Sequence, residues 1–388
     1  MKQAKQAALQ DGDDTKKAPL HRTIYMALLQ SIRTGEYRDG DRLPSEAELC
    51  KQFNASRITV AKAIQNLQQE GMVVRRPGSG SYVQSAACTT TSYQFGLLIP
   101  ELGTTEIFEP ICQGIMRSPQ AKSHSLIWGH MLRSDSGREE TALALCRQFI
   151  EQKVSGVFFA PLEYTDSKDL INHRVVAELR QAGIPIVLLD RCYLLYPMRS
   201  NLDRVGIDNH RASYLVTQHL WDRGARRIVF LARKRSASTM VERVSGYFSA
   251  LRDAGSQYEG RAVFGDVADA DFVQRVLREE HTDAVVCGND LTAARLMQTL
   301  IAVGTQVPEQ VRLVSFDDVN YAKFLPVPLT TIHQNCDKIG EAAIELMLQR
   351  IAEPERPGMD VQVPFELVVR ESCGQPAHES KLSALANG

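Results

Sequence analysis

The feature that most constrains the fold is a long alternation of short apolar runs with helical segments, which begins at Tyr93 and fills most of the remaining chain. Runs such as GLLIP, GVFFAP and PIVLLD are short, and each is followed by a segment whose apolar residues have helical spacing. Strands that alternate with helices in this way predict a parallel sheet covered by helices on both faces. We therefore expect an α/β fold.

The alternation runs twice along the chain. One series ends near Asp190, and another begins with the RVGID run at residues 204–208 and closes with VRLVSFDD at 311–318. Two series predict two similar lobes, each a doubly wound parallel sheet. Ligands of such sheets bind beyond the carboxyl ends of the strands, so two lobes that face each other would enclose a small molecule.

Polar side chains follow several of the predicted strands. They include Glu163, Tyr164, Asn289, Asp317 and the later Gln334. Paired donors and acceptors suit a polyhydroxylated ligand, because a buried hydroxyl needs partners of both kinds. The alternative is that an Asn or Asp at a strand end only caps the next helix. The ligand hypothesis therefore depends on the whole set.

A different pattern precedes the alternation, and it predicts two short helices and a hairpin. Ser45 and Glu48 have the spacing of a capping box, which predicts a helix start. Asn54 tolerates the left-handed conformation that ends a helix, Ser56 can cap a second helix, and Gly71 suits its C-terminal end. Residues 72–76 and 81–83 follow as short strands joined by the turn at 77–80.

The second helix leaves a polar face without an acid. Its members are Arg57, Thr59, Lys62, Gln65 and Asn66. Such cationic, amide and hydroxyl groups suit phosphates and base edges, and a helix of this length fits the major groove of DNA. Arg75 and Arg76 would lie on the hairpin, near the DNA backbone or minor groove. The alternative is an ordinary solvated face.

Charge favours the DNA interpretation. Lys16 to Gln84 contain 11 Lys and Arg against 6 Asp and Glu, whereas the whole chain has a formal net charge of −1. The basic surplus is therefore local to this region, as expected of a nucleic-acid-binding module.

Length and composition are those of a globular protein of several domains. No run in the 388 residues approaches the roughly 18 apolar residues of a membrane helix, so no membrane partner is expected. The N-terminus lacks the apolar core of a signal peptide, and the cysteines are scattered without metal-ligand spacing. We expect a cytoplasmic protein with reduced thiols, no metal and no cofactor. The expected organisation is a disordered arm at 1–17, a DNA-binding domain at 18–84, a linker at 85–92, a two-lobed domain at 93–373 and a tail at 374–388.

The motifs LPSEAEL, SRITVAKAIQNLQQEG and RRPGSGSYV resemble the winged helix-turn-helix of GntR-type bacterial regulators over roughly residues 18–84. The resemblance implies DNA contacts from the cap serine, the arginine after it and the Gly-rich wing tip. Many members carry Arg where this chain has Ala47 and Ala61, which implies a different base readout here. The candidate DNA-contacting residues are Ser45, Ser56, Arg57, Thr59, Lys62, Gln65, Arg75, Arg76, Gly78, Ser79 and Gly80.

The motifs RVSGYFSAL, CGND, VSFDD and PLTTIHQN are similar to the effector domain of the LacI/GalR repressors, over roughly residues 93–373. That family shares its fold with periplasmic sugar-binding proteins. The resemblance implies that Arg243 donates to a ligand hydroxyl or carboxylate, that Asn289 and Asp317 are hydroxyl partners, and that loops of the first lobe contribute. The candidate effector-binding residues are Glu106, Phe108, Glu163, Tyr164, Arg243, Asn289, Asp317 and Gln334.

The same resemblance implies that the chain passes between the lobes three times, near Asp190, near Gln334 and within residues 351–357. Many members also stack an aromatic ring on the sugar from the position of Val267. Phe108 or Tyr164 would supply the apolar face instead in this chain.

The combination is typical of arabinose-repressor-like architectures, and it predicts a transcriptional regulator controlled by a ligand. We expect a homodimer on double-stranded operator DNA, a sugar effector and repression of carbohydrate-utilisation genes. A nucleoside or purine effector and activation remain alternatives. An enzyme is the first rival, but the chain lacks the phosphate-loop, nucleophile-elbow and zinc-protease motifs. A transport-type binding protein is the second, and the missing signal peptide and basic head oppose it.

Overall fold

The computed structural model describes residues 20–33, 36–38, 40–69, 71–76, 79–83, 92–99, 107–128 and 137–374. The chain divides into two compact units, Met1–Ser92 and Tyr93–Gly388, which we call the head and the effector domain. The expected arm, the expected linker apart from Ser92 and the expected tail apart from Gly374 lie outside the described residues. No helix among the described residues is long and apolar enough to cross a membrane.

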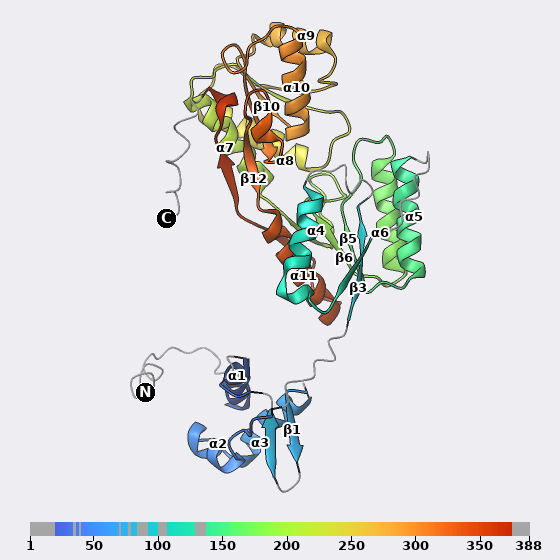
Figure 1. Cartoon of the computed structure of the whole chain (residues 1–388), viewed down its shortest axis with the longest axis vertical. Helices are drawn as coiled ribbons and strands as arrows, with labels where there is room; N and C mark the ends of the chain where they lie inside the picture. The colour runs from blue at the N-terminus through green and yellow to red at the C-terminus, as the bar shows by residue number, and fades with distance from the viewer. Residues whose placement is uncertain are drawn as a thin grey trace. The chain divides into compact units, whose positions relative to one another are not determined.

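The head consists of three helices and a two-stranded antiparallel hairpin (Figure 1). Its elements are α1 (Leu20–Arg33), α2 (Glu46–Phe53), α3 (Arg57–Gln69), β1 (Val73–Arg76) and β2 (Gly80–Val83). Ile24 and Leu28 of α1 are buried against Val60, Ile64 and Leu67 of α3. The apolar stripe of α1 therefore packs behind α3 and leaves the opposite face of α3 in solvent.

The helix boundaries of the head confirm the capping predictions. The Ser45 amide donates to Glu48 Oε2 at 2.7 Å, and the Glu48 amide donates to Ser45 Oγ at 3.3 Å, which closes a reciprocal capping box. Asn54 ends α2 with φ of 48°, and Gly71 follows α3 with φ of 72°. Ser56 Oγ accepts the amide of Thr59 at 3.3 Å and so caps α3.

The first lobe of the effector domain is a six-stranded sheet in the order β13-β7-β6-β5-β3-β4, all of whose neighbours are parallel. Helices α4 and α11 cover one face and helices α5 and α6 the other (Figure 1). The strands are β3 (Gln94–Leu98), β4 (Ser125–Trp128), β5 (Gly156–Phe159), β6 (Ile186–Leu189), β7 (Asp203–Gly206) and β13 (Asp360–Gln362). The helices are α4 (Phe108–Arg117), the short 3-10 helix η1 (Pro119–Ala121), α5 (Arg138–Glu151), α6 (Lys168–Gln181) and α11 (Cys336–Ala352).

The second lobe repeats the arrangement in the order β14-β12-β11-β10-β8-β9, and only the β12–β14 pair is antiparallel. Helices α7 and α8 cover one face, and α9 and α10 the other. The strands are β8 (Ile228–Ala232), β9 (Arg261–Phe264), β10 (Ala284–Cys287), β11 (Arg312–Asp317), β12 (Thr330–Gln334) and β14 (Phe365–Val368). The helices are α7 (Asn209–Asp222), α8 (Thr239–Asp253), α9 (Ala270–Glu280), α10 (Asp290–Ala302), and the 3-10 helices η2 (Ala322–Phe324) and η3 (Glu371–Cys373).

Two of the three expected crossings between the lobes are wrong. The chain does not leave the first lobe near Asp190, because β7 pairs with β6 and belongs to the first sheet. It crosses at residues 206–209, between β7 and α7. It crosses back between β12 and α11, beside Gln334 as expected. The last crossing lies at residues 362–365, between β13 and β14, rather than within residues 351–357.

Candidate functional site

The exposed face of α3 carries the candidate base-reading residues. Arg57, Lys62 and Gln65 are exposed, with no acid in the first turn of the helix. The hydroxyls of Ser56 and Thr59 lie 2.8 Å apart and bond to each other as part of the cap, so they position the helix start. This arrangement leaves one face of the N-terminal turns of α3 in solvent, where a recognition helix would meet the major groove.

Ser45 caps the start of α2, and its hydroxyl is not free for another partner. Its Oγ donates to Glu48 Oε2 at 2.7 Å and accepts the Glu48 amide, so both of its roles are used within the capping box. A phosphate contact from this position would therefore come from the end of α2 as a whole.

The hairpin holds its arginines against neighbouring side chains. Arg75 Nη2 lies 2.9 Å from Glu46 Oε1, and the guanidinium of Arg76 lies 4.8 Å from the ring centre of Tyr82. Ser79 Oγ and the Tyr82 hydroxyl are 2.6 Å apart. Both arginines are exposed, so each keeps donors free for a phosphate.

Arg42 is a further cation at this hairpin, and the sequence interpretation missed it. Gly80 begins β2 with φ of 119°, and a Cβ on it would lie 2.9 Å from Arg42 Nε. Arg42 is exposed and forms a β-bridge with Tyr82. In the sequence, only the positive charge of Arg42 indicates that it could contact DNA. Gly78 lies outside the described residues.

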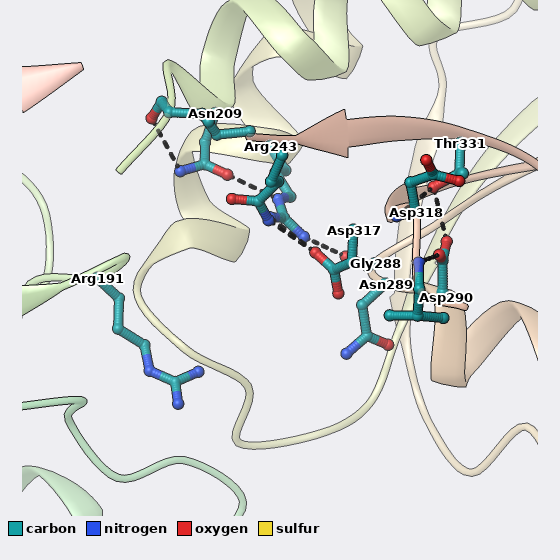
Figure 2. Close-up of polar contacts among 12 residues, drawn as sticks. Arg191, Asn209, Arg243, Gly288, Asn289, Asp290, Asp317, Asp318 and Thr331 are labelled. Atoms are coloured by element: carbon teal, nitrogen blue, oxygen red, sulfur yellow. Dashed lines mark hydrogen bonds and ion pairs between the residues drawn. The ribbon is translucent and has the colours of Figure 1, made fainter. Parts of the chain in front are cut away.

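In the effector domain, Arg243 is the centre of a buried polar cluster at the strand ends of the second lobe (Figure 2). Its Nε donates to Asn209 Oδ1 at 2.8 Å, and its Nη1 donates to the Gly288 carbonyl at 2.6 Å. Nη2 lies 3.8 Å from Asp317 Oδ1, and the guanidinium lies 4.3 Å from the ring centre of Phe316. These contacts fix the guanidinium beside the Asp317 carboxyl.

Asp317 is held in a strained conformation at the end of β11. Its φ is 112°, outside the range that residues other than glycine usually adopt. Gln334 Nε2 donates to its Oδ1 at 2.8 Å. Burial raises the pKa of Asp317 well above its usual range, although the Arg243 charge opposes the shift. Strained backbone of this kind is often found at ligand sites, where the surrounding structure holds it.

Asn289 has two roles, one with each end of its amide. Its Oδ1 accepts the Thr292 amide at 3.0 Å and the Thr292 hydroxyl at 2.6 Å, so it caps α10 as the alternative interpretation expected. Its Nδ2 lies 3.4 Å from the hydroxyl of Tyr164, a residue of the first lobe. The cap thus aims the amide nitrogen across the interface between the lobes (Figure 2).

Glu163 and Tyr164 contact the other lobe directly. Glu163 Oε1 pairs with Arg191 at 2.6 Å, while its Oε2 accepts the Ala237 amide at 3.1 Å. The Tyr164 amide donates to the Arg235 carbonyl at 2.7 Å. We call this contact region, residues 163–166 and Cys192 of the first lobe with residues 235–238 of the second, the latch.

Two further contacts complete the latch. Ser238 Oγ donates to the Cys192 carbonyl at 2.7 Å. Arg235 forms an ion pair with Asp166. The two lobes are therefore joined by side-chain and backbone hydrogen bonds at this edge of their interface.

The expected apolar faces are each covered by a guanidinium. Arg191 lies over the Phe108 ring with 5.1 Å to its centre, and Arg233 lies over the Tyr164 ring at 4.0 Å. Val267, at the position from which the resemblance implied a stacked aromatic, is buried in the apolar core of the second lobe. Glu106 lies outside the described residues.

Buried polar atoms without a partner gather between the lobes. They are Asp190 Oδ1, Arg191 Nε and Gln334 Oε1, on side chains that are 4%, 7% and 1% exposed. Of these three residues, Gln334 lines a pocket of about 230 Å³, together with Asp317 of the second lobe and with Ile107 and Gln113 on the side of α4. Because orphaned buried polar groups are costly, these atoms are candidates for hydrogen bonds to a polar ligand.

Sequence reasoning placed Asp190 and Arg191 at a strand end but did not include them among the binding residues. Asn209 was missed because it follows the strand that was assigned to the wrong lobe. The periodicity of that strand, β7, could not have revealed that it pairs with β6. Phe316 is an apolar strand residue, and nothing in its local sequence marks it as the surface on which Arg243 stacks.

The two parts of the chain match two family models. Residues 20–83 match the bacterial regulatory proteins of the gntR family, and residues 217–373 match the periplasmic binding protein-like domain. The head is therefore similar to the gntR-type heads of bacterial regulatory proteins. The effector domain has the two-lobed fold of LacI-type regulators.

Transcriptional repressors match most of the length of this chain. The arabinose metabolism transcriptional repressor of Geobacillus stearothermophilus is 26% identical over 92% of this chain and 98% of the relative. The HTH-type transcriptional repressor PurR of Vibrio atlanticus is 26% identical over 81% of this chain and 90% of the relative. Among solved structures, the transcriptional regulator CelR–cellobiose complex has a TM-score of 0.60 and 23% identity, covering 82% of this chain and 91% of that one.

Proposed function

We propose that the regulator is a homodimeric repressor whose operator affinity is set by a small neutral sugar bound between the lobes. The observation that carries the sugar assignment is the set of unpartnered buried atoms Asp190 Oδ1, Gln334 Oε1 and Arg191 Nε. Two are acceptors and one is a donor. A hydroxyl serves either kind, because it donates one hydrogen bond and accepts others.

The charges of the site favour a neutral ligand over an anionic one. Burial raises the pKa of Asp317 and of Asp190 above the usual range, which favours the neutral form of both carboxyls. Gln334 Nε2 is bound to Asp317, and Gln334 Oε1 has no partner, so a ligand carboxylate or phosphate would meet an oxygen there where it needs a donor. A sugar hydroxyl would meet the same oxygen with its proton.

The size of the pocket favours a small ligand. Its volume of about 230 Å³ lies below the roughly 300–1,000 Å³ of sites for drug-sized molecules. A purine would need an open aromatic face, whereas Phe108 and Tyr164 each already face a guanidinium. The repressor of arabinose metabolism and the cellobiose-bound regulator among the relatives support a sugar, while the PurR relatives keep a purine as the competitor to test.

The remaining parts of the proposal follow from the head. One winged head reads one half-site, so a two-fold operator calls for two copies of the chain. The regulator acts by binding rather than by catalysis, as the named activities of its relatives support. It acts in the cytoplasm, where its DNA lies. The choice of repression over activation is supported by the same relatives, which are named as repressors.

A screen with the full chain tests the proposal. Duplexes that bind the chain are first selected from a randomised library, and ligands are then screened by thermal shift. The panel contains neutral pentoses and hexoses, sugar acids, and purine bases and nucleosides. We expect a neutral monosaccharide to raise the melting temperature by mass action.

The same sugar should change the affinity for the selected duplex by about 5- to 150-fold, the usual size of allosteric coupling. Increasing salt should weaken DNA binding steeply, since phosphate contacts release counterions. Light scattering should give the mass of a dimer. Equal affinity for selected and random duplex under every ligand would contradict the regulator proposal, and a response to purines alone would contradict the sugar.

A further inference from the structure

Ile58 is an exposed apolar side chain on the DNA-facing helix of the head. It is 82% exposed, more than any other large apolar side chain among the described residues. Scattered exposed apolar residues are normal on protein surfaces, so exposure alone carries no meaning. The position of Ile58 is what distinguishes it, because it is the second residue of α3.

The local structure fixes Ile58 at the end of the helix that would enter the groove. The Ser56 cap lies two residues before it, with Ser56 Oγ bound to both the amide and the hydroxyl of Thr59. The next core residue, Val60, is fully buried on the opposite side. The first turn is therefore anchored, and the Ile58 side chain points away from the core of the head.

Ile58 shares a helix face with the polar residues expected to read bases. Lys62 and Gln65 follow it at spacings of four and seven, and both are exposed. Ala61, three residues along, is too small to cover it. The face therefore offers one apolar group nearest the helix N-terminus, followed by a cation and an amide.

Only one apolar group is available to such a side chain in the major groove, namely the C5-methyl of thymine. Isoleucine has no hydrogen-bonding group, so it can gain nothing from the donors and acceptors of the other base edges. We propose that Ile58 contacts a thymine methyl in each operator half-site and makes recognition depend on that methyl. This inference rests on the proposed DNA-binding function and names the chemical feature that the head reads.

Uracil provides a direct test, because it differs from thymine only by the missing methyl. Duplexes selected by the full chain from a randomised library are remade with uracil at single thymine positions. The affinity of the full chain is measured for each pair. At the contacted position we expect the unmodified chain to bind uracil about fourfold more weakly, the equivalent of one buried methyl group.

The Ile58→Ala variant completes the comparison. It should bind the thymine duplex more weakly than the unmodified chain and should not distinguish uracil from thymine. Alanine favours the helix, and the lost side chain is exposed, so the melting temperature should not fall. As a matched control, Met26→Ala removes a side chain that is 55% exposed on α1, and it should leave both affinities and the uracil effect unchanged.

The outcomes separate this inference from the function on which it rests. If the chain selects no duplex at all, the DNA-binding proposal fails. If it selects duplexes but the Ile58→Ala variant responds to uracil as the unmodified chain does, Ile58 does not read a methyl and the inference is wrong. If the variant binds both the thymine and the uracil duplex more weakly than the unmodified chain, and by the same factor, the inference is also wrong.

Discussion

At the scale of single residues, Asn289 couples the fold of the second lobe to its binding surface. Its oxygen caps α10 through Thr292, and its nitrogen points at Tyr164 across the lobe interface. A capping side chain is held by its own helix, so its second polar atom is oriented at no extra entropic cost. One amide therefore caps α10 and directs a donor at the first lobe.

Replacing Asn289 in two ways separates these roles. Asn289→Asp keeps an oxygen for the cap but puts an acceptor where the nitrogen was, so we expect unchanged stability and sugar binding weaker by about tenfold or more. Asn289→Ala loses both, and should also cost about 1 kcal/mol of stability. Urea unfolding and titration calorimetry measure the two effects. Equal sugar affinity in the Asp variant would show that the amide nitrogen does not contact the ligand.

Asp290, the next residue, should make stability depend on pH. It is fully buried, where it accepts the Val319 amide and the Thr331 hydroxyl, and burial raises its pKa to about 7. A carboxyl with a raised pKa binds its proton more tightly in the folded state. Its contribution is therefore most favourable below the ordinary pKa of about 4 and is lost as pH rises towards 7.

We expect Asp290→Asn to remove this dependence. Relative to the variant, the unmodified chain should lose up to about 1.4 kcal/mol for each pH unit between roughly 4 and 7. Urea unfolding at several pH values measures the difference. Asp253→Asn, at an exposed acid of α8, is the control and should follow the unmodified chain. A constant difference across this range would show that Asp290 ionises normally.

At the scale of elements, the closest packing in the first lobe is the crossing of α4 and α11. Gly340 of α11 lies against the α4 backbone, and a Cβ on it would be 2.4 Å from the Ile115 amide nitrogen. Gly114 of α4 faces α11 in the same way, with a Cβ position 2.8 Å from the Asp337 Cα. Only hydrogen atoms fit between the two backbones at these positions.

Gly340→Ala should therefore force the helices apart. Overpacking of this kind costs about 1–3 kcal/mol, and more where backbone must move. We expect a lower melting temperature for the effector domain, measured by calorimetry. Glu345→Ala, on the exposed side of the same helix, should change stability by no more than about 0.5 kcal/mol. Similar decreases in melting temperature in the two variants would mean that α4 and α11 can move apart at their crossing at little cost in free energy.

The elements also show what the sequence can and cannot predict. The α2 cap at Ser45 and Glu48 and the turn at Asn54 depend on neighbouring residues, so local pattern predicted them. The residues joined by Arg243 lie far apart in the chain, and a family motif rather than periodicity indicated them. The strand containing Val205 was assigned to the wrong lobe, because its pairing with β6 is a tertiary choice that alternation does not encode. The sequence pattern also did not predict that Glu163 contacts Arg191 and Ala237.

At the scale of the whole molecule, the latch joins the two lobes by contacts that involve no ligand. Ser238 bonds to Cys192, Arg235 pairs with Asp166, and the Tyr164 amide donates to the Arg235 carbonyl, all between lobes. A ligand that binds the closed arrangement gains affinity in proportion to the fraction of molecules already closed. The latch should therefore tune the sugar concentration to which the regulator responds.

Weakening the latch tests this. We expect the double variant Ser238→Ala/Asp166→Ala to bind the sugar more weakly, by at most about 30-fold, because each of the two lost bonds contributes about 1 kcal/mol at most. Its radius of gyration, measured by X-ray scattering without sugar, should increase. Asp169→Ala removes an acid that pairs with Lys168 within one lobe and should change neither quantity. Unaltered sugar affinity in the double variant would rule out a role for the latch.

The three passages of the chain between the lobes also bear on biosynthesis. The edge strands β13 and β14 come from residues 360–368, and α11, which covers the first sheet, begins only at Cys336. A ribosome that has just released residue 335 has completed the head but neither lobe. Neither sheet can therefore be completed before residue 360 has been made, and a premature stop before that residue would leave the head attached to two incomplete lobes.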